Sequence, residues 1–200
     1  VSPKPDAPVL SSSAASACEG DPITLSATGA VDANTTYEWT LTTADGTATV
    51  VATTNAPTLT LDAVSADQAG TYTVETIGGG GACPSGPSNG VDISVSPRPD
   101  APELTVDKDT HCEGDRLEFM ATPIAGATYT WSFTNPEGRV DFLAEGTRPS
   151  LVIENLVFTN TGNYQVVITL DGCPSLPSND VAIDVASGGL PDVTATSIAT

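Results

Sequence analysis

This sequence is short of the side chains that most catalytic and nucleic-acid-binding sites need. Its 200 residues include one histidine, His111, and six lysines and arginines against 25 aspartates and glutamates. A serine or cysteine nucleophile needs a positioned base, usually an imidazole, so the lone histidine argues against such an enzyme. We expect His111 to be an exposed turn residue. The scarcity of positive charge also argues against nucleic acid or anionic lipid as a partner. We predict a protein that is not an enzyme.

Long apolar runs and cofactor motifs are also missing. No stretch approaches the roughly 18 apolar residues that a membrane-spanning helix needs, so no direct membrane insertion is expected. Gly78–Gly81 is glycine-rich, but it follows a predicted strand and opens no helix, so it predicts a hairpin loop and not a phosphate site. The net charge of −19 is divided evenly along the chain. It indicates a solvated acidic surface, with specific cation binding as the alternative.

What the sequence does contain is an internal repeat. The repeated segments are SPKPDAP (residues 2–8) and SPRPDAP (96–102), CEGD (18–21 and 112–115), and CPSGPSN (83–89) and CPSLPSN (173–179). We therefore predict one domain over residues 1–95, a second over 96–186, and a linker and tail over 187–200. The prolines that precede each copy predict a short, semi-rigid joint, because proline favours extended backbone.

Within each copy, apolar and polar residues alternate over short segments, which predicts strands. The segments are residues 23–27, 37–41, 47–53, 59–61, 72–76 and 91–95 in the first copy, and 117–121, 129–133, 151–153, 164–168 and 181–185 in the second. Several short strands with one apolar face, in a domain of about 90 residues, are typical of a β-sandwich. The predicted fold class is all-β, with two tandem sandwiches.

Residues 59–74, LTLDAV followed by GTYTV, resemble strands E and F of immunoglobulin domains, and residues 151–166 match the same pattern. The resemblance implies immunoglobulin-like domains in which Tyr72 and Tyr164 are tyrosine-corner residues. It also implies that Trp39 and Trp131 are the strand-C tryptophans, packed across the core. One feature of antibody domains is missing, because the positions of the core disulfide hold Ala27 and Val74 in the first copy, and Ala121 and Val166 in the second.

The complete pattern is C-x-G, then Y-x-W, then G-x-Y, then a late cysteine. It resembles the Ig-like and PKD-like repeats of large secreted and surface proteins of Bacteroidetes-type bacteria. The resemblance covers nearly all of residues 1–186. It implies an extracellular or cell-surface location.

The four cysteines lie at matching positions of the two copies, which indicates disulfides and an oxidising compartment. Given the resemblance, the default pairing is Cys18 with Cys83 and Cys112 with Cys173. However, these positions lie at opposite ends of a standard sandwich, and a disulfide tolerates only about 4.4–6.8 Å between Cα atoms. Either the last strand bulges through Pro84–Pro87 and carries the cysteine along the domain, or the bridges run between neighbouring modules. We predict the intradomain pairs and keep the second arrangement as the alternative.

Two regions leave further alternatives open. No cofactor is expected, although Asp100 and Asp107–Asp109 lie near the domain joint, where calcium stiffens some tandem β-domains. Residues 193–198 alternate like a strand. This tail is a frayed end, the first strand of a further module, or a strand that pairs with another chain.

Three functional hypotheses follow. The first is a non-enzymatic structural or adhesive module, a rigid rung of a bacterial surface stalk, adhesin or filament, whose partners are neighbouring Ig-like modules. The second is a module that recognises a host or cell-surface glycan or protein, appended to a secreted enzyme. Exposed loop aromatics would support it, but we expect Phe142 and Phe158 to be core or turn-anchoring residues. The third is a filament subunit that assembles through its C-terminal strand. We favour the first.

Overall fold

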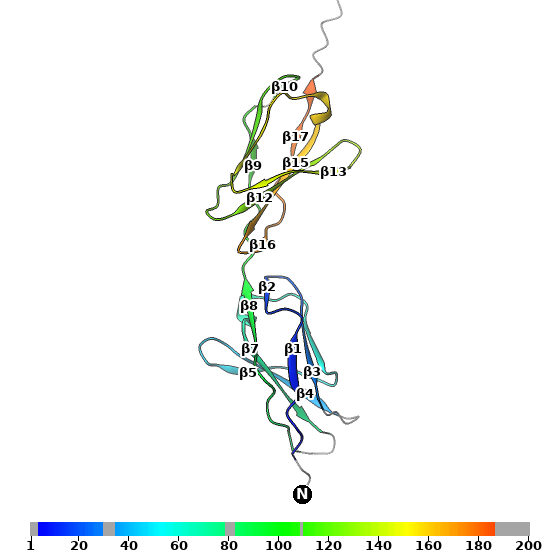
Figure 1. The fold of residues 1–200 in the computed structure, drawn as a ribbon, viewed down its shortest axis with the longest axis vertical. Coiled ribbons are helices and arrows are strands. Elements are labelled where there is room, and N and C mark those ends of the chain that lie inside the picture. The colour runs from blue at the N-terminus through cyan, green and yellow to red at the C-terminus, as the bar shows by residue number, and fades with distance from the viewer. Residues whose placement is uncertain (1–3, 30–34, 79–82, 109, 187–200) are drawn as a thin grey trace, which may run out of the picture. The chain divides into compact units, whose positions relative to one another are not determined.

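The computed structural model describes residues 4–29, 35–78, 83–108 and 110–186. The chain divides into two compact units, Val1–Pro97 and Arg98–Thr200. Each unit is a β-sandwich with its own core (Figure 1), so the predicted all-β, immunoglobulin-like fold is confirmed. The predicted tail strand, residues 193–198, lies outside the described residues.

Unit 1 packs a three-stranded sheet, in the order β1-β3-β6, against a five-stranded sheet, in the order β2-β8-β7-β4-β5. Its elements are β1 (Val9–Ser12), β2 (Ser16–Cys18), β3 (Ile23–Thr28), β4 (Thr36–Thr42), β5 (Ala48–Thr54), β6 (Thr58–Leu61), the 3₁₀ turn η1 (Ala66–Gln68), β7 (Gly70–Ile77) and β8 (Val91–Ser96). The pairing of β2 with β8 is parallel, and the remaining described pairs are antiparallel.

Unit 2 repeats this arrangement. One sheet has the strand order β14-β11-β9. The other has the order β13-β12-β15-β16, and β17 also pairs with β15. In addition, β10 and β18 form a parallel pair. Its elements are β9 (Leu104–Val106), β10 (His111–Cys112), β11 (Leu117–Ala121), β12 (Thr128–Thr134), β13 (Val140–Gly146), β14 (Ser150–Ile153), η2 (Phe158–Asn160), β15 (Gly162–Leu170), β16 (Cys173–Pro174), β17 (Val181–Ile183) and β18 (Val185–Ala186).

The two tryptophans and the two strand-F tyrosines lie in the cores. Trp39 and Trp131 are 0% and 2% exposed, and each tyrosine is 1% exposed. The Tyr72 hydroxyl donates to the backbone carbonyl of Gln68, and the Tyr164 hydroxyl donates to that of Asn160, both at 2.9 Å. Each bond runs from strand F, which is β7 in unit 1 and β15 in unit 2, back to the 3₁₀ turn before it, and this is the geometry of a tyrosine corner.

Glycine is required at the start of strand F in both units. Gly70 and Gly162 have φ angles of 150° and 155°, which side-chain-bearing residues rarely adopt. A Cβ on Gly70 would also collide with the carbonyl oxygen of Thr42, and a Cβ on Gly162 would collide with that of Thr134. The G-x-Y pattern therefore has a steric cause, the close approach of strand F to the end of strand C.

Candidate functional sites at the ends of each domain

The first candidate site is the turn that carries the earlier cysteine of each unit. In unit 1, the Asp21 carboxylate accepts from the Cys18 amide at 3.2 Å, while the Asp21 amide donates to the Cys18 carbonyl at 3.0 Å. Between them, Gly20 has a φ of 85° with open space around it, so the backbone angle and not crowding selects glycine. The sequence C-x-G-D therefore builds one defined turn.

The same turn is present in unit 2. Asp115 makes the equivalent pair of bonds with Cys112, at 3.3 and 3.1 Å, and Gly114 has a φ of 88°. Each turn is also attached to the core residue that follows strand E. Gly20 donates to Val64 and Val64 donates to Asp21, and the same two bonds join Gly114, Asp115 and Leu156. Val64 and Leu156 are 1% and 0% exposed, so both cysteine turns are anchored to a core.

The second candidate site is the CPSxPSN segment, which begins with the later cysteine and precedes the last strand paired with strand F, β8 in unit 1 and β17 in unit 2. Its prolines cannot donate to strand F. In unit 1, two serine hydroxyls of the segment accept hydrogen bonds from backbone amides of strand F. The Thr76 amide donates to the Ser85 hydroxyl at 2.9 Å, and the Val74 amide donates to the Ser88 hydroxyl at 3.0 Å. Ser175 and Ser178 make the same bonds to Ile168 and Val166 in unit 2.

The asparagine that ends this segment joins it to the other sheet. The Asn89 side chain accepts from the Leu10 amide and donates to the Leu10 carbonyl, both at 2.9 Å. Asn179 makes the same two bonds to Leu104, at 2.8 and 3.0 Å. An asparagine side chain thus pairs with β1 in unit 1, and with β9 in unit 2, as a backbone amide would. Sequence analysis did not identify these bonds, because a side chain that bonds to a strand distant in the chain leaves no periodic pattern.

The two cysteines of a unit lie at opposite ends of its sandwich. In unit 1, Cys18 pairs with Ser96, beyond the Gly70 end of β7, whereas Cys83 precedes Ser85, which bonds to Thr76 near the other end. At about 3.3 Å per residue, Gly70 and Thr76 alone are roughly 20 Å apart. In unit 2, Cys112 lies beyond the Gly162 end of β15, whereas Cys173 pairs with Leu170 at its other end.

The predicted intradomain disulfides are therefore wrong. In unit 1, Cys18 is disulfide-bonded and Cys83 is a free, exposed thiol. In unit 2, Cys173 is disulfide-bonded and Cys112 is free and exposed. The prolines do not carry Cys83 along the domain, because Ser85 and Ser88 follow strand F in register and hold the cysteine at its end.

The lone histidine also differs from expectation. His111 is 5% exposed, because it occupies the inward-facing position of β10 opposite Val185, while its neighbour Cys112 faces outward. Its Nδ1 has no hydrogen-bond partner among the described residues. The prediction of an exposed turn residue was wrong because a two-residue strand is too short to show an alternation.

A hollow of about 720 Å³ beside β8 is lined by one ionisable residue, Asp92, which accepts from the Thr71 hydroxyl at 2.5 Å. Asp107 accepts from the Glu118 amide, and Lys108 pairs with Asp115 at 3.7 Å. Both residues therefore lie beside the Cys112 turn, and not at the joint that was predicted as the possible calcium site. Within the described ranges, no three of the potential ligands His, Cys, Asp and Glu come together as a metal site would require.

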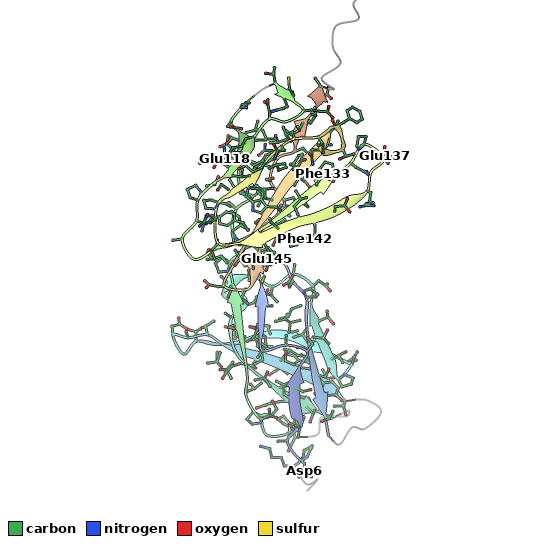
Figure 2. All side chains as sticks on the ribbon, turned by 45° about the horizontal axis from the view of Figure 1, so that its top comes forward. Asp6, Glu118, Phe133, Glu137, Phe142 and Glu145 are labelled. Atoms are coloured by element: carbon green, nitrogen blue, oxygen red, sulfur yellow. The ribbon has the colours of Figure 1, made fainter. Side chains whose placement is uncertain are left out.

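Exposed aromatic side chains are found where none were expected. Phe142 is 66% exposed on the edge strand β13 (Figure 2), and Phe158 is 59% exposed in η2. Phe158 lines a hollow of about 200 Å³ together with Asn135, Glu137 and Thr161. The prediction that both phenylalanines belong to the core or anchor turns was wrong.

Residues 5–97 match the family model described as "Ig-like domain CHU_C associated". These residues, which make up nearly all of unit 1, are similar to this family. The resemblance to Bacteroidetes-type Ig-like repeats is thereby confirmed for these residues. Unit 2 has the same turn, serine bonds and asparagine bridge as this CHU_C-associated domain.

Solved structures show the same fold at low sequence identity. A marsupial T cell receptor is 14% identical with a TM-score of 0.55, over 88% of this chain and 72% of the receptor chain. A chain from the mouse coronavirus receptor-binding domain complexed with its murine receptor is 16% identical with a TM-score of 0.53, over 90% and 100%. The FN1–FN3 domains of chicken CNTN1 are 13% identical with a TM-score of 0.53, over 91% and 68%.

No curated protein sequence matches this chain. Among the described residues, no helix has the length and apolar character needed to cross a membrane.

Proposed function

We propose that this chain is a non-enzymatic, load-bearing rung of an extracellular stalk, adhesin or filament on the bacterial surface. The observation that carries this proposal is the parallel pairing of an early and a final strand in each unit: β2 with β8, and β10 with β18. The match of residues 5–97 to a Bacteroidetes-type Ig-like family model supports the extracellular location.

Parallel terminal strands resist tension for a geometric reason. A pull on the two ends of a unit draws the early strand toward its N-terminus and the final strand toward its C-terminus. The hydrogen bonds between parallel strands then lie across the direction of pulling and are loaded together, whereas a peeled ladder breaks one bond at a time. In unit 1 the pairing is extended by bonds from Ser94 to Ala15 and from Glu19 to Ser96, at 3.0 and 2.9 Å.

Single-molecule pulling through the chain termini, with all cysteines reduced, tests this proposal. We expect two unfolding steps, each releasing up to roughly 3.6 Å of extended chain per residue. Ser94→Pro removes the amide that donates to Ala15, so it should lower the unfolding force of unit 1. The step of unit 2 in the same molecule is the matched control. An unchanged force for unit 1, in a variant that still unfolds cooperatively on heating, would contradict the load-bearing role.

A second candidate function is recognition of a glycan or protein. The observation that favours it is the exposure of Phe142 and Phe158, because aromatic faces stack on sugars and anchor protein interfaces. Valines are also exposed on the edge strands of the two units, at Val50 and Val51 on β5 and Val140 on β13. A glycan array probed with the chain and with Phe158→Ala should show signals that this substitution removes. An array without such signals would exclude the carbohydrate version.

A further inference from the structure

Each unit has one cysteine in a disulfide and one free thiol, and the bonded position differs between the units. The turn position is bonded in unit 1, at Cys18, and free in unit 2, at Cys112. The CPSxPSN position is bonded in unit 2, at Cys173, and free in unit 1, at Cys83. Both kinds of position are therefore used for disulfides in this protein, and one of each kind remains free.

The free cysteines are built like their bonded counterparts. Cys112 lies in the same C-x-G-D turn as Cys18, with matching aspartate bonds and a matching anchor to the core. Cys83 precedes the same serine-bonded segment as Cys173. Both free cysteines are exposed. Both thiols are therefore exposed, and each belongs to a hydrogen-bonded segment of defined conformation.

A free cysteine cannot pair within its own unit, because the two positions lie at opposite ends of a sandwich and are separated by a distance several times the limit for a disulfide. We propose that Cys112 of one copy of this chain forms a disulfide with Cys83 of a second copy. The bond joins a turn position to a CPSxPSN position, the two kinds of position that are bonded in this structure.

Such a link is heterologous, because it joins two different positions of the two copies. It joins the C-terminal end of unit 2 in one copy to the N-terminal end of unit 1 in the next. Each such bond leaves one Cys83 and one Cys112 thiol free in the product, so further copies can be added by the same reaction. The net charge of −19 opposes the approach of two copies, so formation of the link should be faster at higher salt.

The bond forms by thiol–disulfide exchange with a small-molecule disulfide such as oxidised glutathione. The Cys112 thiolate attacks the oxidant, forming a mixed disulfide and releasing one reduced glutathione. The Cys83 thiolate of the second copy then attacks the protein sulfur of that mixed disulfide and releases a second reduced glutathione. Two thiols are oxidised, one disulfide is reduced, and the two protons from the cysteines appear on the glutathione products.

Two single variants of the whole chain test the pairing. Cys83→Ser retains only the Cys112 thiol free, and Cys112→Ser retains only Cys83. In a glutathione redox buffer, an equimolar mixture of the two variants should form a disulfide-linked dimer on a non-reducing gel, while each variant alone should stay monomeric. Peptide mass mapping of the oxidised wild-type chain should find the Cys112–Cys83 bond in about tenfold excess over each homotypic bond, or about 1.4 kcal/mol of preference.

The Cys83→Ser/Cys112→Ser double variant is the control and should remain monomeric with an unchanged melting temperature, because both side chains are exposed. Homotypic dimers as abundant as the mixed dimer would overturn the proposal. So would thiols that remain reduced while Cys18 and Cys173 stay oxidised. The disulfide proposal depends on the proposed function in one respect: both require that the protein is located in an oxidising, extracellular compartment. Pulling is measured with every cysteine reduced, so either proposal can fail without the other.

Discussion

Single side chains decide the shape of the cysteine-bearing turn. Gly20 and Gly114 have positive φ angles in open space, and the adjacent aspartates close the turn on the cysteine backbone. A residue with a Cβ in this left-handed region costs about 1–2 kcal/mol. The turn therefore depends on a glycine, which has no Cβ, and on the carboxylate of the aspartate that follows it.

We expect Gly20→Ala to destabilise unit 1 by about 1–2 kcal/mol, which corresponds to roughly 4–8 °C in melting temperature for each kcal/mol in a domain of this size. Gly86→Ala is a matched control in the same unit, because the counterpart of Gly86 in unit 2 is Leu176 and no positive φ is required there. Calorimetry would measure both. Equal effects of the two substitutions would show that backbone conformation is not the reason for Gly20.

The tyrosine corner of unit 2 predicts a dependence of stability on alkaline pH. Burial raises the pKa of the Tyr164 phenol from its ordinary value of 10.0 to about 12. The folded state thus holds this proton more tightly than the unfolded state, so the stabilisation is complete below about pH 10 and is lost as the pH rises through about 12.

Denaturant unfolding of unit 2 between pH 8 and 12 checks this expectation. Tyr164→Phe should cost about 1 kcal/mol at neutral pH, the net value of a lost hydrogen bond. It should also make the stability fall less steeply above pH 10. A variant whose alkaline profile matches that of the wild-type chain would mean that another group controls the decline.

At the level of strands, the serines of the CPSxPSN segment complete strand F where prolines interrupt strand G. The Val166 amide donates to the Ser178 hydroxyl, and this bond is buried. Removal of the hydroxyl leaves a buried amide without a partner, which costs about 1–3 kcal/mol. The segment is a strand substitute and not merely a loop.

We therefore expect Ser178→Ala to lower the stability of unit 2 by about 1–3 kcal/mol, measured by denaturant unfolding. Ser11→Ala removes an exposed hydroxyl, which donates to Ser26 at 3.2 Å, and should change the stability of unit 1 by less than about 0.5 kcal/mol. If both substitutions are neutral, the serine bonds contribute nothing to the sandwich.

For the chain as a whole, the remaining question is how copies assemble. The C-terminal strand hypothesis and the disulfide proposal predict different responses to the same two treatments. If Leu190–Thr200 is donated to a neighbour, its deletion abolishes assembly. If Cys112 and Cys83 link the copies, the deletion leaves assembly intact and a reductant abolishes it.

We expect the second outcome, measured by light scattering and negative-stain microscopy with and without reductant. The Cys83→Ser/Cys112→Ser variant should stay monomeric under both conditions. Polymers that survive reduction but vanish on deletion of the tail would favour strand donation instead.

The amino-acid sequence alone determined the duplication, the strands and the immunoglobulin-like fold. Alternating side chains and turn residues are local signals, and each is repeated at a second place in the chain. Trp39, Tyr72 and their counterparts were predictable for the same reason, because each lies in a short pattern of fixed spacing.

Only the tertiary structure decided which side chains face outward and which cysteines can meet. The pairing of β12 with β13 has a bulge after Trp131, which interrupts the alternation of inward and outward side chains along β13. The two partly buried residues of β13, Asp141 and Ala144, are therefore three residues apart, and Phe142 is exposed. A shift of one residue reverses the faces of a strand, and periodicity alone does not reveal it. Cysteine pairing depends on which end of a sandwich each residue occupies, and the length of strand F separates the two positions of one unit.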